Sequence, residues 1–107
     1  MTDAVVVLVT TPTSEAATEI ARVLVEEGLA ACGNVVPGIR SVYRWGGETH
    51  DDAEALLVIK TVRRLVTSVK ERLPLLHPYQ VPELLVLPVE DGLGAYLEWI
   101  ANSVRPG

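Results

Sequence analysis

The residues best suited to chemistry lie in one short stretch, His77-Pro78-Tyr79-Gln80-Val81-Pro82-Glu83. Its imidazole, phenol and carboxylate are groups that bind metal ions or act as acid–base pairs. The two prolines restrict the backbone, so a stiff loop would present these side chains. On spacing alone, a simpler interpretation is favoured, in which His77 hydrogen-bonds the last carbonyls of a preceding helix. No HxH, HExxH or CxxC spacing occurs, which argues against a preformed structural zinc site.

Two other groups could bind metal ions. Cys32 is the single cysteine, and it is either a reactive thiol and soft-metal ligand or, as its apolar neighbours favour, a buried inert thiol. His50-Asp51-Asp52 could bind a divalent cation, although a solvated, charged start of a strand is the favoured interpretation. One cysteine cannot form an internal disulfide, so the chain suits a reducing compartment.

Four more side chains are candidates for an interface. Tyr43 and Trp45 lie on one face of their predicted strand, as interface anchors often do. Glu54 and Lys60 also share one face of a strand, but six residues separate them by roughly 20 Å. They therefore cannot pair within one chain, although each could meet the loop of a neighbouring chain.

Composition limits the class of protein. A length of 107 residues predicts one domain, residues 1–107. Nine basic and fourteen acidic residues give a net charge of −5, which disfavours nucleic acid as a partner. The longest apolar run near the start, residues 4–9, is too short to span a membrane. The residues before it lack the positive charge that begins a signal peptide. The predicted location is the cytoplasm.

Enzyme signatures are missing from the sequence. It contains no GxGxxG, GxxxxGK[ST] or GxSxG motif, and no serine with a nearby base. No catalytic set emerges, and we predict a binding protein and not an enzyme.

The first half of the chain predicts a strand, a helix and a long hairpin. The β-branched run at residues 5–9 predicts a central strand buried on both faces. A helix follows, capped by Thr13 or Ser14 and ended by Gly28. Residues 31–45 are extended, with a bulge or bend at Pro37-Gly38. Gly46-Gly47 predicts a two-residue turn into a returning strand over about 52–61, which would pair Trp45 with Glu48, Tyr43 with His50 and Ile39 with Glu54.

The second half predicts a helix over residues 63–76, which Pro74 should stop or kink. A short buried strand at 84–87, closed by Pro88, and a small helix over 92–103 complete the chain. The order β-α-β, β-α-β, helix predicts an α+β fold of the split βαβ type, with an antiparallel four-stranded sheet and helices on one face. The long hairpin has unpaired edges and apolar side chains, which favours oligomerisation through sheets.

The residues together resemble the CutA divalent-cation tolerance family over essentially the whole chain. The matching segments are Leu29-Ala30-Ala31-Cys32-Gly33-Asn34, Pro37-Gly38, Ser41-Val42-Tyr43-Arg44-Trp45 with Gly47, Glu54, residues 56–61, residues 77–83, Tyr96-Leu97 and Trp99-Ile100.

This resemblance implies a ferredoxin-like protomer in a tight homotrimer, similar to the PII nitrogen-regulatory proteins, whose long hairpins pair sheets across subunits. It also implies tolerance of divalent cations and, in some members, copper binding. No cofactor is required, and copper or zinc is the possible metal, with His77 as its ligand. The implied cleft between subunits gathers His77 with Cys32, Tyr43, Glu54, Lys60, Tyr79 and Glu83.

The chain departs from the copper-associated members at two positions. Val9 stands where they carry a cysteine, and Leu76 where they carry a second histidine. Copper selects thiolate and imidazole ligands, so His77 alone is an incomplete copper site. The function expected is a trimer that responds to metal ions and binds a metal or small ligand weakly in its cleft. The alternative is a structural or signalling scaffold with no metal role.

Overall fold

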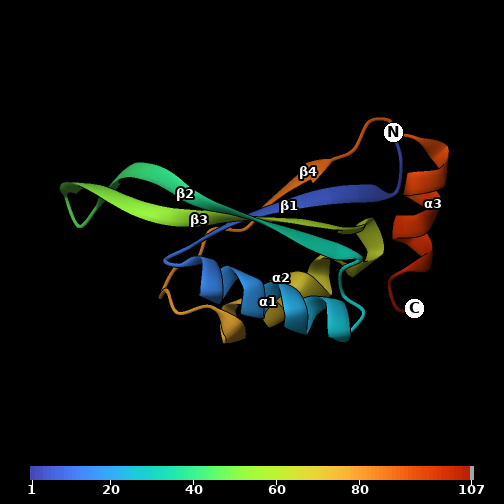
Figure 1. Ribbon diagram of the computed structural model, residues 1–107, viewed down its shortest axis with the longest axis horizontal. Helices are drawn as coiled ribbons and strands as arrows, with labels where there is room; N and C mark the ends of the chain where they lie inside the picture. Colours follow the sequence, from blue (N-terminus) through green and yellow to red (C-terminus); the bar gives the residue numbers. More distant parts are fainter. Residues whose placement is uncertain (107) are drawn as a thin grey trace.

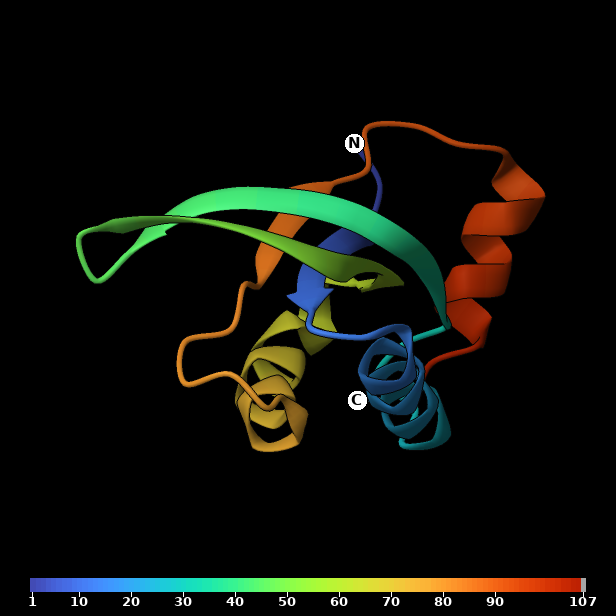
Figure 2. The ribbon, with the colours of Figure 1, turned by 60° about the vertical axis from the view of Figure 1, so that its left-hand side comes forward.

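The computed structural model describes residues 1–106. The elements are β1 (Ala4–Thr11), α1 (Ser14–Glu26), β2 (Cys32–Trp45), β3 (Glu48–Val62), a 3-10 turn (Arg63–Leu65), α2 (Val66–Leu76), β4 (Leu85–Pro88) and α3 (Gly94–Asn102). The strands form one sheet in the order β2-β3-β1-β4, with each neighbouring pair antiparallel. Helices α1 and α2 cover one face of this sheet (Figure 2). The predicted α+β fold of ferredoxin-like type, with an extra C-terminal helix, is confirmed.

The core lies between the sheet and the two helices. Alternate residues of β1 and β3 point into it, because successive side chains of a strand face opposite sides. The fully buried members from the sheet and from α1 and α2 include Val5, Val7, Val9, Leu57, Ile59, Leu24, Val69 and Leu73. None of the helices in residues 1–106 is long and apolar enough to cross a membrane.

Strand β1 is central, but the prediction that both of its faces are buried is wrong for the protomer. Val5, Val7 and Val9 are buried, whereas Val6 and Leu8 are only half-buried. The reason is that α1 and α2 form a single layer, so they leave the other face of the sheet uncovered. We call this second face the open face.

The hairpin has the predicted register. Trp45 pairs with Glu48, Tyr43 with His50 and Ile39 with Glu54. The register shifts between Val36 and Ile39, where two residues of β2 oppose one of β3, and this is the predicted bulge. Both turn glycines have positive φ, 62° at Gly46 and 78° at Gly47, as a tight hairpin turn requires. Beyond the bulge the hairpin projects from the body of the molecule as an arm, away from the N-terminus and α3 (Figure 1).

The helix boundaries follow local signals at α1 but not at α2. Thr13 caps α1 by accepting a 3.1 Å hydrogen bond from the Ala16 amide, and Gly28 adopts φ 73° just past the end. Helix α2 runs through Pro74 to Leu76, so the predicted end of the helix near residue 76 is confirmed. Of the two effects predicted for Pro74, a stop or a kink, the stop does not occur. The proline lies in the last turn, where it removes a single amide donor and only a few residues follow.

Strand β4 is not the buried strand that residues 84–87 predicted. It spans Leu85–Pro88 at the edge of the sheet, and Leu85 and Leu87 are 55% and 46% exposed. Among residues 1–106 it pairs with β1 alone. Its apolar composition reflects the open face, which no helix of the α1–α2 layer covers.

Candidate functional site

A groove of about 640 Å³ lies between the hairpin arm and the loop of residues 77–83. Its wall residues come from β2, β3 and the 77–83 loop, with Thr10 at the end of β1. The lining includes Tyr43, Trp45, Glu54, Tyr79, Gln80 and Glu83. Four of the predicted cleft residues, Tyr43, Glu54, Tyr79 and Glu83, therefore meet within a single protomer.

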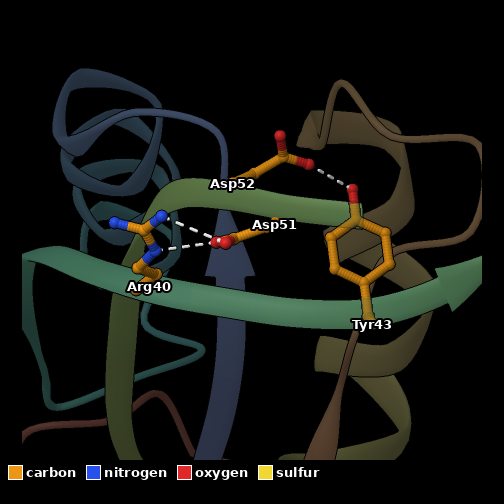
Figure 3. Close-up of polar contacts among 4 residues, drawn as sticks. All are labelled: Arg40, Tyr43, Asp51 and Asp52. Atoms are coloured by element: carbon orange, nitrogen blue, oxygen red, sulfur yellow. Dashed lines mark hydrogen bonds and ion pairs between the residues drawn. The ribbon is translucent and has the colours of Figure 1, made fainter. Parts of the chain in front are cut away.

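Two tyrosine hydroxyls of the groove donate to carboxylates of β3. Tyr79 Oη donates to Glu54 at 2.5 Å, which joins the 77–83 loop to the sheet. Tyr43 Oη donates to Asp52 at 2.6 Å across the hairpin (Figure 3). Burial, followed by the hydrogen bond to Glu54, raises the pKa of Tyr79. The hydrogen bond to Asp52, followed by burial, raises the pKa of Tyr43.

Glu83 is half-buried and lines the groove from the 77–83 loop. Burial raises the pKa of its carboxyl, and the negative charge of Glu54 raises this pKa further. The groove therefore holds two carboxylates that repel each other. A positively charged partner would relieve that repulsion with both carboxylates ionised.

His77 lies behind the groove and holds its loop in place. The side chain is 7% exposed, its Nε2 is 2.8 Å from the Thr10 carbonyl, and its Nδ1 accepts the Tyr79 amide at 3.1 Å. Because Nδ1 accepts, Nε2 carries the proton and donates to Thr10. Its acceptor is thus a carbonyl of β1, and the interpretation that the ring bonds the last carbonyls of the helix is wrong.

The metal-ligand role of His77 stays a prediction. A metal ion would have to displace one of its two hydrogen bonds, because each ring nitrogen already has a partner. Within residues 1–106, no three or more His, Cys, Asp or Glu side chains are grouped to hold a metal ion.

Cys32 and Lys60 lie elsewhere in the protomer. They are paired directly across β2 and β3, at the far end of these strands from the hairpin turn. Cys32 is half-buried with its Sγ 3.8 Å from the Tyr96 hydroxyl of α3, and Lys60 donates to Asn34. The seven predicted cleft residues thus fall into two groups in one chain.

The His50-Asp51-Asp52 segment does not converge on one point. Asp51 pairs with Arg40, with distances of 2.7 and 3.0 Å to its two carboxylate oxygens, and Asp52 accepts from Tyr43 (Figure 3). The ring of His50 stacks on Tyr43 with 5.2 Å between centroids. These contacts run across the hairpin, so the segment braces the arm.

Sequence reasoning missed Thr10, Arg40 and Asp52 as members or neighbours of the groove. The hairpin register contained the signal for one of them. Tyr43 opposes His50 and Ser41 opposes Asp52, so Tyr43 and Asp52 are diagonal neighbours on one face, within reach of a long side chain. Thr10 had no comparable signal, because its place depends on how the 77–83 loop packs.

The fold and the groove define a class of small α+β proteins with a projecting hairpin arm, and comparisons with known proteins specify the family. The model of the family described as CutA1 divalent ion tolerance protein matches residues 5–103. The chain belongs to this family.

Individual relatives agree with this assignment. The chain is 52% identical over 98 residues to the divalent-cation tolerance protein CutA of Thermus thermophilus, covering 92% of this chain and 95% of that protein. It is 48% identical to the chloroplastic CutA protein of Arabidopsis thaliana, covering 94% of this chain and 56% of the plant protein. The crystal structure of CutA1 from Oryza sativa superposes with a TM-score of 0.94 at 45% identity, covering 99% of this chain and 97% of that one.

Proposed function

We propose that this protein is a homotrimeric binding protein of the cytoplasm, built from one domain, that takes up small positively charged ligands in its groove. Divalent cations such as copper and zinc are weak ligands in this proposal, and the protein catalyses no reaction. The observation that supports it best is that two carboxylates, those of Glu54 and Glu83, line one groove with aromatic walls and that the charge of Glu54 acts on Glu83. The family's description as divalent ion tolerance proteins agrees with a cationic ligand and names no reaction.

The trimer is supported by the apolar open face and the arm. Leu85, Leu87 and Val36 are exposed, and Val6 and Leu8 are half-buried on the same face. Covering such a surface contributes roughly 25 cal/mol for each Å² of apolar area removed from water. In the proposed trimer, the arm of one subunit lies on a neighbour, and the groove becomes part of a cleft between subunits to which Cys32 and Lys60 of a neighbour contribute.

Sedimentation tests the assembly. Leu87→Lys places a charge in the proposed interface, and we expect it to shift the protein from trimer towards monomer. Leu75→Lys is the matched control, because Leu75 is 77% exposed on α2 and away from the open face. A wild-type protein that sediments as a monomer at micromolar concentration would remove the trimer from the proposal.

Calorimetric titration of the metal-free protein with copper and zinc tests the ligand. We expect weak binding that Glu83→Gln and Glu54→Gln reduce, because each removes a negative charge from the groove. His77→Ala tests the predicted metal ligand directly. If all three variants bind as the wild type does, the groove is not the cation site.

The alternative is a trimeric scaffold without a metal role. It is favoured by one observation, that both ring nitrogens of His77 are already hydrogen-bonded within the chain. Under this alternative Tyr79→Ala would weaken the trimer in sedimentation, and neither metal would bind in the calorimeter.

A further inference from the structure

We infer that the ligand for which the groove is built is a small organic cation, an alkylammonium or guanidinium compound, in preference to a bare metal ion. The inference rests on the proposed function and names the ligand class of the same groove. It follows from three properties of the groove: its charge, its aromatic walls and its size.

The charge around the groove is negative and only partly compensated. Four carboxylates stand in or beside it, those of Asp51, Asp52, Glu54 and Glu83, against one guanidinium, that of Arg40. Arg40 donates to both carboxylate oxygens of Asp51. Its positive charge is therefore already compensated by Asp51. Within residues 1–106 neither glutamate forms an ion pair, and the Tyr79 phenol is the hydrogen-bond donor to Glu54. Lys60 of a neighbour in the proposed trimer would add one positive charge to the cleft. The four carboxylates still outnumber these two cations, and a positively charged ligand would reduce the excess of negative charge.

Aromatic rings form much of the remaining wall. Tyr43, Trp45 and Tyr79 line the groove, and these are three of the five aromatic side chains of the protein. The hydroxyls of both tyrosines are occupied by Asp52 and Glu54. His50 stacks on the Tyr43 ring and His77 lies against the Tyr79 ring. The ring surface that remains available is that of the exposed Trp45 and the uncovered parts of the two tyrosines. Such surface attracts ammonium and guanidinium groups through the negative potential of the π face.

The same geometry suits a metal ion poorly. A bound metal ion requires several donor atoms converging on one point, and the described residues contain no such group of three His, Cys, Asp or Glu side chains. A volume of about 640 Å³ also lies within the range of pockets that enclose small organic molecules. Spread carboxylates and ring faces match a charge that is delocalised or carried on an alkyl body.

The test uses n-butylguanidinium and its neutral isostere n-butylurea as probes of the intact chain. Trp45 lies in the groove and Trp99 lies on α3, so Trp99→Phe leaves Trp45 as the single tryptophan reporter. We expect butylguanidinium to change the Trp45 fluorescence saturably and butylurea to bind at least tenfold more weakly. The attraction between butylguanidinium and the groove is partly electrostatic, and the carboxylates involved are partly exposed to solvent. Salt should therefore screen it and weaken the binding of butylguanidinium.

Two variants and one control connect binding to the groove. Glu83→Gln should weaken butylguanidinium about fivefold to tenfold in calorimetry, and Trp45→Ala, at an exposed position of the arm, should weaken it while leaving the circular dichroism of the fold unchanged. Glu90→Gln, which removes an exposed carboxylate outside the groove, should bind as the wild type does.

The outcomes separate this inference from the proposed function. Equal binding of butylguanidinium and butylurea, or binding unchanged in Glu83→Gln and Trp45→Ala, overturns the organic cation. If copper or zinc binding still depends on Glu83 in that case, the proposed function of the groove as a cation site is retained and only the organic cation is rejected. If neither metal nor butylguanidinium binding depends on any groove residue, both proposals are wrong.

Discussion

The hydroxyl of Tyr79 donates a 2.5 Å hydrogen bond to the carboxylate of Glu54 and so connects the 77–83 loop to β3, 25 residues earlier in the chain. This contact closes one side of the groove. It also sets the distance between two elements that share no backbone hydrogen-bond ladder.

The contact has a measurable energy. We expect Tyr79→Phe and Glu54→Gln to be non-additive in denaturant unfolding, with a coupling energy of about 1 kcal/mol, because the bond joins a phenol to a charged acceptor at a partly exposed site. Tyr96→Phe combined with Glu54→Gln is the control and should be additive, since Tyr96 contacts Cys32 and not β3's carboxylate. Additivity of Tyr79→Phe with Glu54→Gln would contradict the contact.

Removal of His77 should destabilise the fold and loosen the 77–83 loop. His77→Ala deletes a buried ring together with its hydrogen bonds to Thr10 and to the Tyr79 amide, and we expect a loss of roughly 2–4 kcal/mol. His50→Ala on the arm should cost less than about 1 kcal/mol. Unfolding in denaturant at one protein concentration measures both, and similar losses for the two histidines would argue against a structural role for His77.

The Glu83 carboxyl should make stability depend on pH in a defined direction. Its pKa is raised in the folded protein, by burial and then by the charge of Glu54, above the ordinary value near 4.5. Between the pKa of Glu83 in the unfolded chain and its raised pKa in the folded protein, the folded state holds more protons than the unfolded state. The free energy of unfolding therefore falls as pH rises through this interval. Glu83→Gln removes this fall, and above the interval the variant should be more stable than the wild type.

Denaturation midpoints measured from pH 4 to pH 8 check this expectation, with Glu90→Gln as the exposed control. If the difference between Glu83→Gln and the wild type has the same value at every pH, Glu83 does not titrate with a raised pKa.

Gly33 lies where β2 packs closely against Ala21 of α1. A Cβ atom at Gly33 would lie 2.8 Å from Ala21 Cβ and 3.2 Å from Leu57 Cδ1, so Gly33→Ala should cost about 1–3 kcal/mol through overpacking. At Gly92 the nearest atom is the flexible end of Leu97, at 3.2 Å, and Gly92→Ala should stay within about 0.5 kcal/mol. Thermal or denaturant unfolding compares the two, and a neutral Gly33→Ala would show that α1 has room to move.

Much of the fold could be predicted because its signals are local. The Gly46-Gly47 turn sets the hairpin register, since both residues accept positive φ and the side chains alternate from there. Thr13 and Gly28 define α1 through capping hydrogen bonds within one helical turn. The element order then leaves few topologies that join short connections to an antiparallel sheet. Pro74 shows the limit of such signals, because a proline near the end of a helix does not decide where the helix stops.

The candidate site was predicted in part. The 77–83 loop, Tyr43 and Glu54 all reach the groove, whereas Cys32 and Lys60 lie at the other end of the strands in this protomer. Strand spacing already separated Glu54 from Lys60. The spacing of residues in the sequence contained no information about which atoms the 77–83 loop contacts in the folded protein.

By itself, then, the sequence determined the elements, the hairpin register and the family, and it marked the segment from His77 to Glu83 as a candidate functional centre. The tertiary structure decided how that segment packs. Packing across 67 residues of sequence pairs His77 with Thr10 and makes it the support of the loop, while Tyr79 and Glu83 face the groove. Local propensities act over a few residues, but hydrogen-bond partners, burial and the sum of charges in a groove depend on which distant surfaces the whole chain brings together.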